Sequence, residues 1–265
     1  MGYRLIAIDL DDTLLRNDLT ISERAKKAIR RSMERGVIVT FATGRMYRSA
    51  LPYALDLCLD VPLITYQGAL VKYADGRMVY HRPVQLETAH EVIDFIKPLG
   101  LHINAYIDDE LYMEEETQWG QKYVGVAKVP VKYIKFPHEI KKDPTKILII
   151  GESDELDRAA LALGNRFGSR INITKSKSFF LEISHPLATK GNALRELAES
   201  LHIPSEKVIA IGDNMNDLDM IEYAGCGVAM GNGVDALKKV ADIVTQNNDD
   251  DGVAEIIERL VINVI

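Results

Sequence analysis

The sequence predicts an α/β protein in which a smaller α+β domain is inserted into a Rossmann-like parallel-sheet domain. The first 70 residues alternate between short aliphatic runs and amphipathic segments, which is typical of successive βαβ units. From about residue 84 to 186 this rhythm changes to a mixture of helices and hairpins, and it then resumes. We therefore expect the first and last thirds of the chain to share one sheet. The predicted domains are 1–83 for the first part of the core, 84–186 for the insert and 187–265 for the rest of the core.

Hydrophobic spacing and turn residues define the elements of the first part. The predicted strands are 3–9, 37–42 and 61–66, followed by a hairpin at 73–84 with an Asp-Gly turn. Thr20 and Glu23 fit a capping box that would begin a helix, and Gly36 is suited to end it. A second amphipathic stretch begins near Met46. The order strand, helix, strand, helix, strand is that of a parallel sheet.

The rest of the chain follows the same two kinds of pattern. In the insert we expect helices at 86–97, 115–125 and 153–167, with strands within 102–113 and in KILIIG, RINITK and FFLEIS. In the last part we expect a strand at 208–213 between helices that begin near 190 and 215. CGVAM and DIVT then read as strands separated by a helix, and 252–262 as a final amphipathic helix.

Composition excludes several classes of protein. Of the 265 residues, 47% are apolar and 27% are charged, and no apolar run approaches the ~20 residues of a membrane span, so we expect no membrane partner. A net charge of −7 argues against a nucleic-acid-binding surface. The N-terminal residues lead directly into a strand pattern without a secretion signal, which predicts a cytoplasmic protein. Cys58 and Cys226 lie far apart, and we expect two free, buried thiols.

Polar residues follow the predicted strands of the parallel sheet. They form four short motifs, D-L-D-D-T (9–13), T-G-R (43–45), K-G (190–191) and G-D-N-M-N-D (212–217). Each motif alone is weak, because a single aspartate after a strand often only caps a turn. In an open α/β sheet, however, ligands bind beyond the carboxyl ends of the strands. The sequence therefore predicts that these motifs meet in one site.

The residue types in these motifs suit the transfer of a phosphoryl group. Asp9 and Asp11 would face the same side if the strand continued past residue 9, so one could attack an electrophile while the other exchanges a proton. A divalent cation would offset their repulsion, and Asp213 would help to bind it. Because no histidine or cysteine lies nearby, this ligand set favours Mg²⁺ over Zn²⁺. Thr43, Gly44 and Lys190 would then hold the phosphoryl oxygens.

The four motifs resemble those of the haloacid dehalogenase-like (HAD) hydrolases, and the whole pattern resembles the Cof-type branch of sugar-phosphate phosphatases. The segments that carry the resemblance span the chain, from D-L-D-D-T-L-L through F-A-T-G-R, A-T-K-G and G-D-N-M-N-D-L-D-M to N-N-D-D-D-G-V-A. The resemblance implies a HAD core with an inserted, mobile C2-type cap, which here is about 84–186.

The resemblance also implies roles for individual residues. Asp9 would be the nucleophile that becomes an aspartyl-phosphate, and Asp11 the general acid and base. Mg²⁺ would be held by Asp9, the backbone carbonyl of Asp11, Asp213 and Asp217, of which Asp217 orders the ion's surroundings. The phosphate would be held by the backbone at Leu10 together with Thr43, Gly44, Lys190 and Asn216.

Three positions receive no definite role. Gln67-Gly68 stands where the family pattern leads us to expect Asn-Gly, so no role is transferred to Gln67. Asp12 occupies a place where relatives often have glycine, and we expect a turn-capping or solvated carboxylate. Arg45 either contacts substrate or forms a salt bridge on the surface or toward the cap.

The sequence therefore predicts a Mg²⁺-dependent phosphatase that hydrolyses small phosphorylated metabolites, with sugar phosphates expected first and pyridoxal phosphate and flavin mononucleotide left open. A phosphomutase or phosphotransferase on the same scaffold is one alternative, and a catalytically inactive metabolite-binding regulator is another. The expected partner is the metabolite alone, and a monomer is preferred over a dimer because a cap can shield the site without a second subunit.

Overall fold

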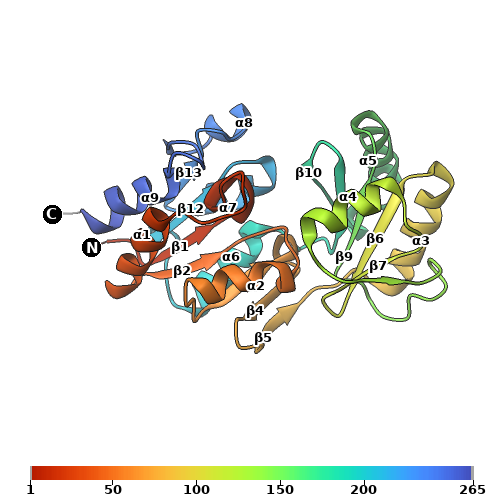
Figure 1. Cartoon of the computed structure of the whole chain (residues 1–265), viewed down its shortest axis with the longest axis horizontal. Coiled ribbons are helices and arrows are strands. Elements are labelled where there is room, and N and C mark those ends of the chain that lie inside the picture. The colour runs from red at the N-terminus through yellow and green to blue at the C-terminus, as the bar shows by residue number, and fades with distance from the viewer. Residues whose placement is uncertain (1, 264–265) are drawn as a thin grey trace. The chain divides into compact units, whose positions relative to one another are not determined.

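The computed structural model describes residues 2–263, which divide into two compact units (Figure 1). The first unit combines Met1–Arg45, Ala50–Val79 and Thr189–Ile265, so both ends of the chain build it. The second unit contains Tyr80–Ala188 together with Met46–Ser49. The predicted fold class, an α/β core with an inserted α+β unit, is confirmed. The domain boundaries at 84 and 186 stay a prediction.

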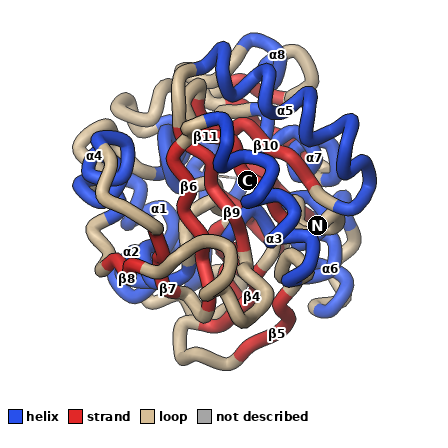
Figure 2. Tube along the Cα trace, turned by 90° about the vertical axis from the view of Figure 1, so that its right-hand side faces the viewer, coloured by secondary structure: helices blue, strands red, loops and turns tan. Residues whose placement is uncertain are grey.

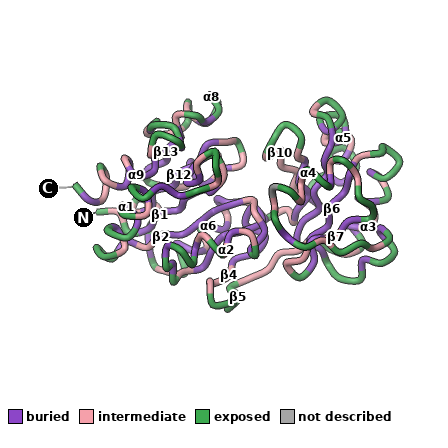
Figure 3. Tube along the Cα trace, in the orientation of Figure 1, coloured by how far each residue is buried: buried purple, intermediate pink, exposed green. Residues whose placement is uncertain are grey.

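The first unit is built on a parallel five-stranded sheet with β1 and β12 near its centre. Its strand order is β14-β13-β12-β1-β2, and every neighbouring pair is parallel. The strands are β1 (Leu5–Ile8), β2 (Ile38–Phe41), β12 (Val208–Gly212), β13 (Cys226–Ala229) and β14 (Ile243–Val244). Both β1 and β12 are buried along their whole length (Figure 3), as their continuous apolar sequences require.

A smaller antiparallel sheet continues from the edge of this one. It has the order β3-β4-β5, with β3 (Pro62–Thr65), β4 (Leu70–Tyr73) and β5 (Met78–His81). The two sheets touch through a parallel bridge between Ala42 and Ile64. The hairpin turn falls at the predicted Asp-Gly pair, where Gly76 has a φ of +96°.

The helices of the first unit pack in pairs, α1 against α9 and α6 against α7. They are α1 (Glu23–Glu34), α2 (Tyr47–Asp56), α6 (Lys190–Ser200), α7 (Leu218–Tyr223), α8 (Asp235–Lys238) and α9 (Gly252–Ile257). The predicted capping box of α1 is wrong: the N-cap is Ser22, whose hydroxyl accepts a 3.0 Å hydrogen bond from the Ala25 N–H. The Thr20 hydroxyl instead bonds the Asp18 carboxylate.

The second unit is a six-stranded sheet with helices on both faces (Figure 2). The order is β10-β11-β9-β6-β7-β8, in which only the pair of β7 and β8 is parallel among the described strands. The strands are β6 (His102–Ile107), β7 (Glu110–Met113), β8 (Val131–Tyr133), β9 (Lys146–Ile150), β10 (Asn172–Lys177) and β11 (Phe180–Ser184). The three-residue strand β8 was not predicted, because so short a segment carries no period.

The two faces of this sheet differ in chemistry. Isoleucines of β6 and β9 pack against α3 (Leu86–Ile96) and α5 (Ser153–Phe167) in one apolar core. On the opposite face lies α4 (Gln118–Ala127), where Gly120 lies against His102. Polar side chains are buried on this second face, and the Nζ of Lys146 lies 2.8 Å from Oε2 of Glu182.

Two further sequence expectations concern cysteines and membranes. Cys226 is buried and Cys58 is exposed, and both are free, so the expectation of two buried thiols is wrong for Cys58. Among residues 2–263, none of the helices is both long enough and apolar enough to span a bilayer.

Candidate active site

The first carboxylate of the site lies at the end of the central strand. Leu5–Ile8 is fully buried, and the chain leaves the sheet at Asp9, which is itself 5% exposed. A tight turn follows, in which the N–H groups of Leu14 and Leu15 donate to the carbonyls of Asp9 and Leu10. The apolar strand thus delivers one acidic side chain, Asp9, into a buried position at the carboxyl end of the sheet.

The neighbouring strand β12 delivers two more carboxylates. Asp213 follows Gly212 directly, and its Oδ1 accepts a 2.9 Å hydrogen bond from the Thr13 hydroxyl. The Asp217 carboxylate turns back over the strand end, where its Oδ2 accepts 3.0 Å bonds from the N–H groups of Asp213 and Asn214. A β-carbon at residue 212 would lie 2.5 Å from the Asp217 side chain, so the close approach requires glycine there.

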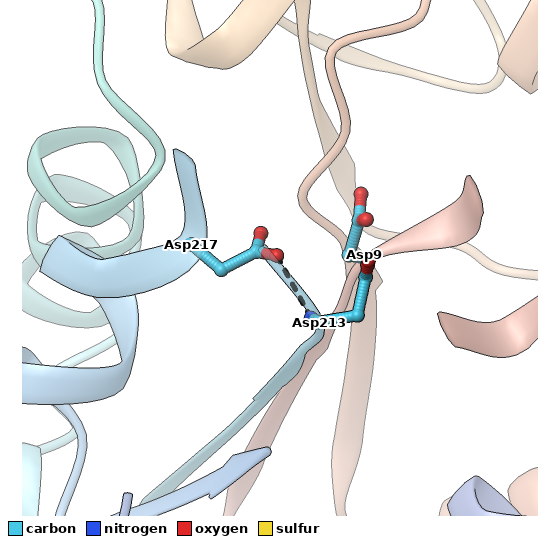
Figure 4. Close-up of side chains that lie close together, drawn as sticks. All are labelled: Asp9, Asp213 and Asp217. Atoms are coloured by element: carbon cyan, nitrogen blue, oxygen red, sulfur yellow. Dashed lines mark hydrogen bonds between the residues drawn. The ribbon is translucent and has the colours of Figure 1, made fainter. Parts of the chain in front are cut away.

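Asp9, Asp213 and Asp217 form a compact buried cluster, shown in Figure 4. Each offers one carboxylate oxygen, and these oxygens all lie within 4.8 Å of one another. Lys190, at the start of α6, inserts its ammonium group among them. Its Nζ lies 2.8 Å from the Asp9 carboxylate and 2.6 Å from that of Asp217.

Burial and crowding shift the pKa values of these groups. Burial raises the pKa of Asp9 well above its ordinary value, because the Lys190 ammonium offsets only part of the desolvation and of the repulsion by Asp217 and Asp213. Burial also raises the pKa of Asp213 to about 7, with the negative charge of Asp217 adding to it. For Lys190, burial alone would lower the pKa, but the two adjacent carboxylates outweigh it and raise the pKa.

The cluster fits a divalent cation. Three carboxylates and one ammonium leave two negative charges uncompensated when all are ionised, which is the charge that a divalent ion supplies. All the protein donors are oxygen atoms, the ligand type that Mg²⁺ and Ca²⁺ prefer.

Asp11 does not join this cluster. Strand β1 ends at Ile8, so the condition for Asp9 and Asp11 to share a face, continued strand geometry, is not met. Instead the Asp11 carboxylate receives two hydrogen bonds from Arg45, from Nε at 2.8 Å and from Nη2 at 2.7 Å. Of the two alternatives for Arg45, the structure therefore supports a salt bridge, but one with a predicted site residue.

The predicted phosphate-binding residues lie on loops of the first unit. Thr43 is 1% exposed, and its hydroxyl oxygen accepts a 3.1 Å bond from the Arg45 N–H, which leaves the O–H hydrogen available to an acceptor. Gly44 lies against the side chain of Gln67, and Asn216 donates to the Gln67 Oε1 at 3.2 Å. Leu10 is buried directly after Asp9, and Lys190 belongs to the carboxylate cluster.

Two residues that contact the site, Thr13 and Gln67, could not be assigned a role from the sequence. Thr13 is the last residue of the motif D-L-D-D-T. Nothing in the spacing of that motif predicts a hydrogen bond to Asp213, which lies 200 positions away. Gln67 was noticed only as a departure from a pattern, but it lies against Gly44 and accepts a hydrogen bond from Asn216, two of the predicted site residues. Asp12, by contrast, is exposed with a φ of +59°, as expected for a turn residue.

An α/β core with acidic residues and a lysine at the strand ends is suited to phosphoryl transfer, and comparison with known proteins identifies the class as hydrolase. Residues 6–257 match the family model of haloacid dehalogenase-like hydrolases. The chain is 31% identical over 260 residues to the Bacillus subtilis enzyme 5-amino-6-(5-phospho-D-ribitylamino)uracil phosphatase, covering 96% of each chain.

Solved structures give the same result. A haloacid dehalogenase-like hydrolase from Bacteroides thetaiotaomicron is 33% identical with a TM-score of 0.89, over 97% of this chain and 99% of that one. A HAD subclass IIB sugar phosphatase shares the fold at 20% identity, with a TM-score of 0.87 over 98% and 99% of the two chains. The chain belongs to the haloacid dehalogenase-like hydrolases, and within them it is a phosphatase, a phosphoric monoester hydrolase, as its motifs indicated.

Proposed function

We propose that this phosphatase hydrolyses small phosphorylated metabolites through an aspartyl-phosphate on Asp9 and requires Mg²⁺. The proposal rests on the environment of the Asp9 carboxylate. Its carboxylate is buried at the end of β1, bonded to Lys190 at 2.8 Å, and grouped with Asp213 and Asp217. A carboxylate in such a place supports nucleophilic attack, because the positive charges around it also stabilise the transferring phosphoryl group.

The chemistry follows from the residues in order. An Oδ atom of Asp9 attacks phosphorus, and the bond from phosphorus to the ester oxygen breaks as that oxygen takes a proton from Asp11. Water then attacks phosphorus while Asp11 removes its proton, the bond between phosphorus and Oδ of Asp9 breaks, and inorganic phosphate leaves the regenerated Asp9 carboxylate. Arg45 holds the Asp11 carboxylate in a fixed orientation through its two bonds.

The remaining groups of the site would bind the metal ion and the phosphoryl oxygens. Asp9, the backbone carbonyl of Asp11, Asp213 and Asp217 would hold Mg²⁺, which when bound compensates the repulsion between the anionic nucleophile and the anionic substrate. Thr43, Gly44, Lys190, Asn216 and the backbone at Leu10 would bind the phosphoryl oxygens. Thr13 keeps Asp213 oriented through its 2.9 Å bond.

For the substrate we propose a phosphorylated sugar or polyol. The relative from Bacillus subtilis acts, by its name, on a phosphoribityl compound, and a sugar phosphatase shares the fold. We further propose that the insert, 84–186, is a cap that selects the organic part of the substrate, and that the protein works as a cytoplasmic monomer without nucleic acid or membrane partners.

Hydrolysis of p-nitrophenyl phosphate tests the mechanism. We expect turnover that requires Mg²⁺ and is lost when EDTA is added. Asp9→Ala and Asp9→Asn should abolish it, because both remove the nucleophile. Asp11→Asn should slow both chemical steps while leaving Mg²⁺ affinity, measured by calorimetry, nearly unchanged, since only its carbonyl would contact the ion.

A covalent label separates this mechanism from direct attack by water. Brief incubation with a ³²P-labelled substrate should place a hydroxylamine-sensitive label on the wild-type chain and none on Asp9→Ala. The matched control is Asp12→Asn, an exposed carboxylate three residues away, which should still be labelled. Normal turnover by Asp9→Ala would contradict the aspartyl-phosphate mechanism.

A further inference from the structure

Gln67 is a buried side chain with an unused hydrogen-bond donor. It is 2% exposed, and its Nε2 has no hydrogen-bond partner among the residues that the structure describes. A buried amide N–H without a partner is costly, and native proteins rarely keep one without a reason. Its other end is satisfied, because Oε1 accepts from Nδ2 of Asn216 at 3.2 Å.

The free donor lies beside the loop that is predicted to bind phosphate. A β-carbon on residue 44 would lie 2.5 Å from Nε2 of Gln67, so the amide group occupies the space that glycine leaves open. The backbone is tied to the same loop, since the N–H of Gln67 donates to the Thr43 carbonyl at 3.0 Å and that of Tyr66 to the Arg45 carbonyl at 2.9 Å. The amide therefore contacts both Gly44 and Asn216, two of the residues assigned to the phosphate.

The backbone that places this amide is strained. Tyr66, Gln67 and Gly68 all have positive φ, of +52°, +57° and +94°. Two successive non-glycine residues in this region cost free energy, which a protein retains where the geometry is used. Gly68 itself is fixed by a close approach, because a β-carbon there would lie 2.3 Å from the Thr189 carbonyl oxygen, next to Lys190.

We propose that Gln67 is a substrate-contacting residue, whose Nε2 donates a hydrogen bond to an oxygen of the bound phosphoryl group. The inference rests on the proposed function, because it assumes that phosphate binds between the Thr43-Gly44 loop and Asn216. A phosphoryl dianion offers only acceptors, and it would accept a hydrogen bond from the amide nitrogen that Gln67 leaves without a partner. The same side chain holds Asn216 through Oε1, so the two amides lie together at this place.

Titration with inorganic phosphate, in the presence of Mg²⁺ and followed by calorimetry, tests this contact without relying on turnover. Gln67→Leu keeps the volume and removes the amide, and we expect it to weaken phosphate binding roughly 10- to 100-fold, as for one lost hydrogen bond to a charged acceptor. Gln67→Glu should be weaker still, since its carboxylate repels phosphate. The control Gln121→Leu, at an exposed position of α4, should bind like wild type.

A second set of variants distinguishes direct contact between Gln67 and phosphate from an indirect effect in which Gln67 only positions Asn216. In an Asn216→Ala background, Gln67→Leu should still weaken phosphate binding, although by a different factor than in wild type, because the two hydrogen-bonded side chains are coupled. A cost that disappears in that background, or a change below about twofold in both, overturns the contact. Gln67→Leu and Gln67→Glu must retain the wild-type circular dichroism, and if the leucine variant misfolds, the isosteric glutamate variant decides.

The two proposals fail separately. If wild type hydrolyses p-nitrophenyl phosphate with Mg²⁺ and Gln67→Leu binds phosphate normally, only the role of Gln67 is wrong. If wild type shows no hydrolysis, the proposed function is wrong, and the phosphate titration still decides whether Gln67 contacts the anion.

Discussion

Asp9, Asp11 and Asp12 are close in sequence but occupy three different environments. Asp9 is buried against Lys190, the Asp11 carboxylate is bonded to Arg45, and Asp12 is exposed. The turn after β1 makes the difference, because Asp12 adopts a φ of +59° while Asp11 stays extended. The backbone of Asp12 is tied to a distant segment through a 2.7 Å bond that its carbonyl accepts from Nδ2 of Asn232.

Substitutions of Asp12 should therefore report on backbone conformation and leave the chemistry intact. Asp12→Gly should keep the rate of p-nitrophenyl phosphate hydrolysis within about twofold and change the free energy of unfolding by less than ~0.5 kcal/mol, because glycine accepts positive φ. Asp12→Val should cost about 1–2 kcal/mol in urea denaturation, since a β-branched residue is strained there. A large loss of activity in a folded Asp12→Gly protein would show that this carboxylate takes part in the reaction.

At the scale of elements, the sheet of the second unit carries an ion pair on its buried polar face. Lys146 on β9 and Glu182 on β11 have side chains only 5% and 6% exposed, and their charged atoms lie 2.8 Å apart. The Ser176 hydroxyl donates a further 2.5 Å bond to the other oxygen of Glu182. The pair thus joins three strands on the face opposite the apolar core.

Breaking this pair should be far more damaging than removing it whole. Lys146→Met alone should lower the free energy of unfolding by about 3–5 kcal/mol, because it leaves the Glu182 carboxylate buried without its cation. The double variant Lys146→Met/Glu182→Leu should recover most of that loss, since both charges are gone. Urea denaturation of the two variants beside wild type measures this, and equal losses in both would refute the interpretation.

At the scale of the whole molecule, the site exists because the first and last segments of the chain pair in one sheet. β1 and β12 are parallel neighbours, with Ile8 opposite Ile211, so Asp9 and Asp213 emerge at the same edge. The resulting cluster concentrates negative charge in a buried place. Its stability must therefore depend on what neutralises it, either protons or a cation.

Because protons and a cation would compete for the same carboxylates, we expect the affinity for Mg²⁺ to depend on pH. Burial raises the pKa of Asp213 to about 7 from an ordinary 3.8, so in the metal-free protein the stabilisation by its bound proton is full below about pH 4 and is lost as the pH rises to about 7. Mg²⁺ binds the ionised form, and its apparent affinity should be roughly 100-fold weaker at pH 5 than at pH 8.

Thermal melting with and without Mg²⁺ checks this dependence. The increase in melting temperature caused by the ion should be large at pH 8 and small at pH 5. Asp213→Asn is the control, because its amide cannot ionise, and it should show little increase at either pH. A shift that is equal at both pH values in wild type would rule out competition between protons and the cation.

How far the sequence could predict the fold is clear from particular elements. The strands β1, β2 and β12 were predictable because buried parallel strands are continuous apolar runs. The start of α1 was not, since Thr20 and Ser22 are both suitable caps and only the backbone path selects Ser22. The strand β8 needed its partner β7 to be recognised, because three residues carry no pattern of their own.

The sequence by itself determined the class of the protein and the candidate residues. The motifs at the strand ends are short, local runs of residues, so they can be recognised without a structure. The tertiary structure decided which of them meet. It grouped Asp9, Asp213 and Asp217 around Lys190, paired Asp11 with Arg45, and placed Gln67 beside Gly44. These contacts join residues distant in sequence, and their geometry depends on register, on turns with positive φ and on space left by glycines, none of which a linear pattern encodes.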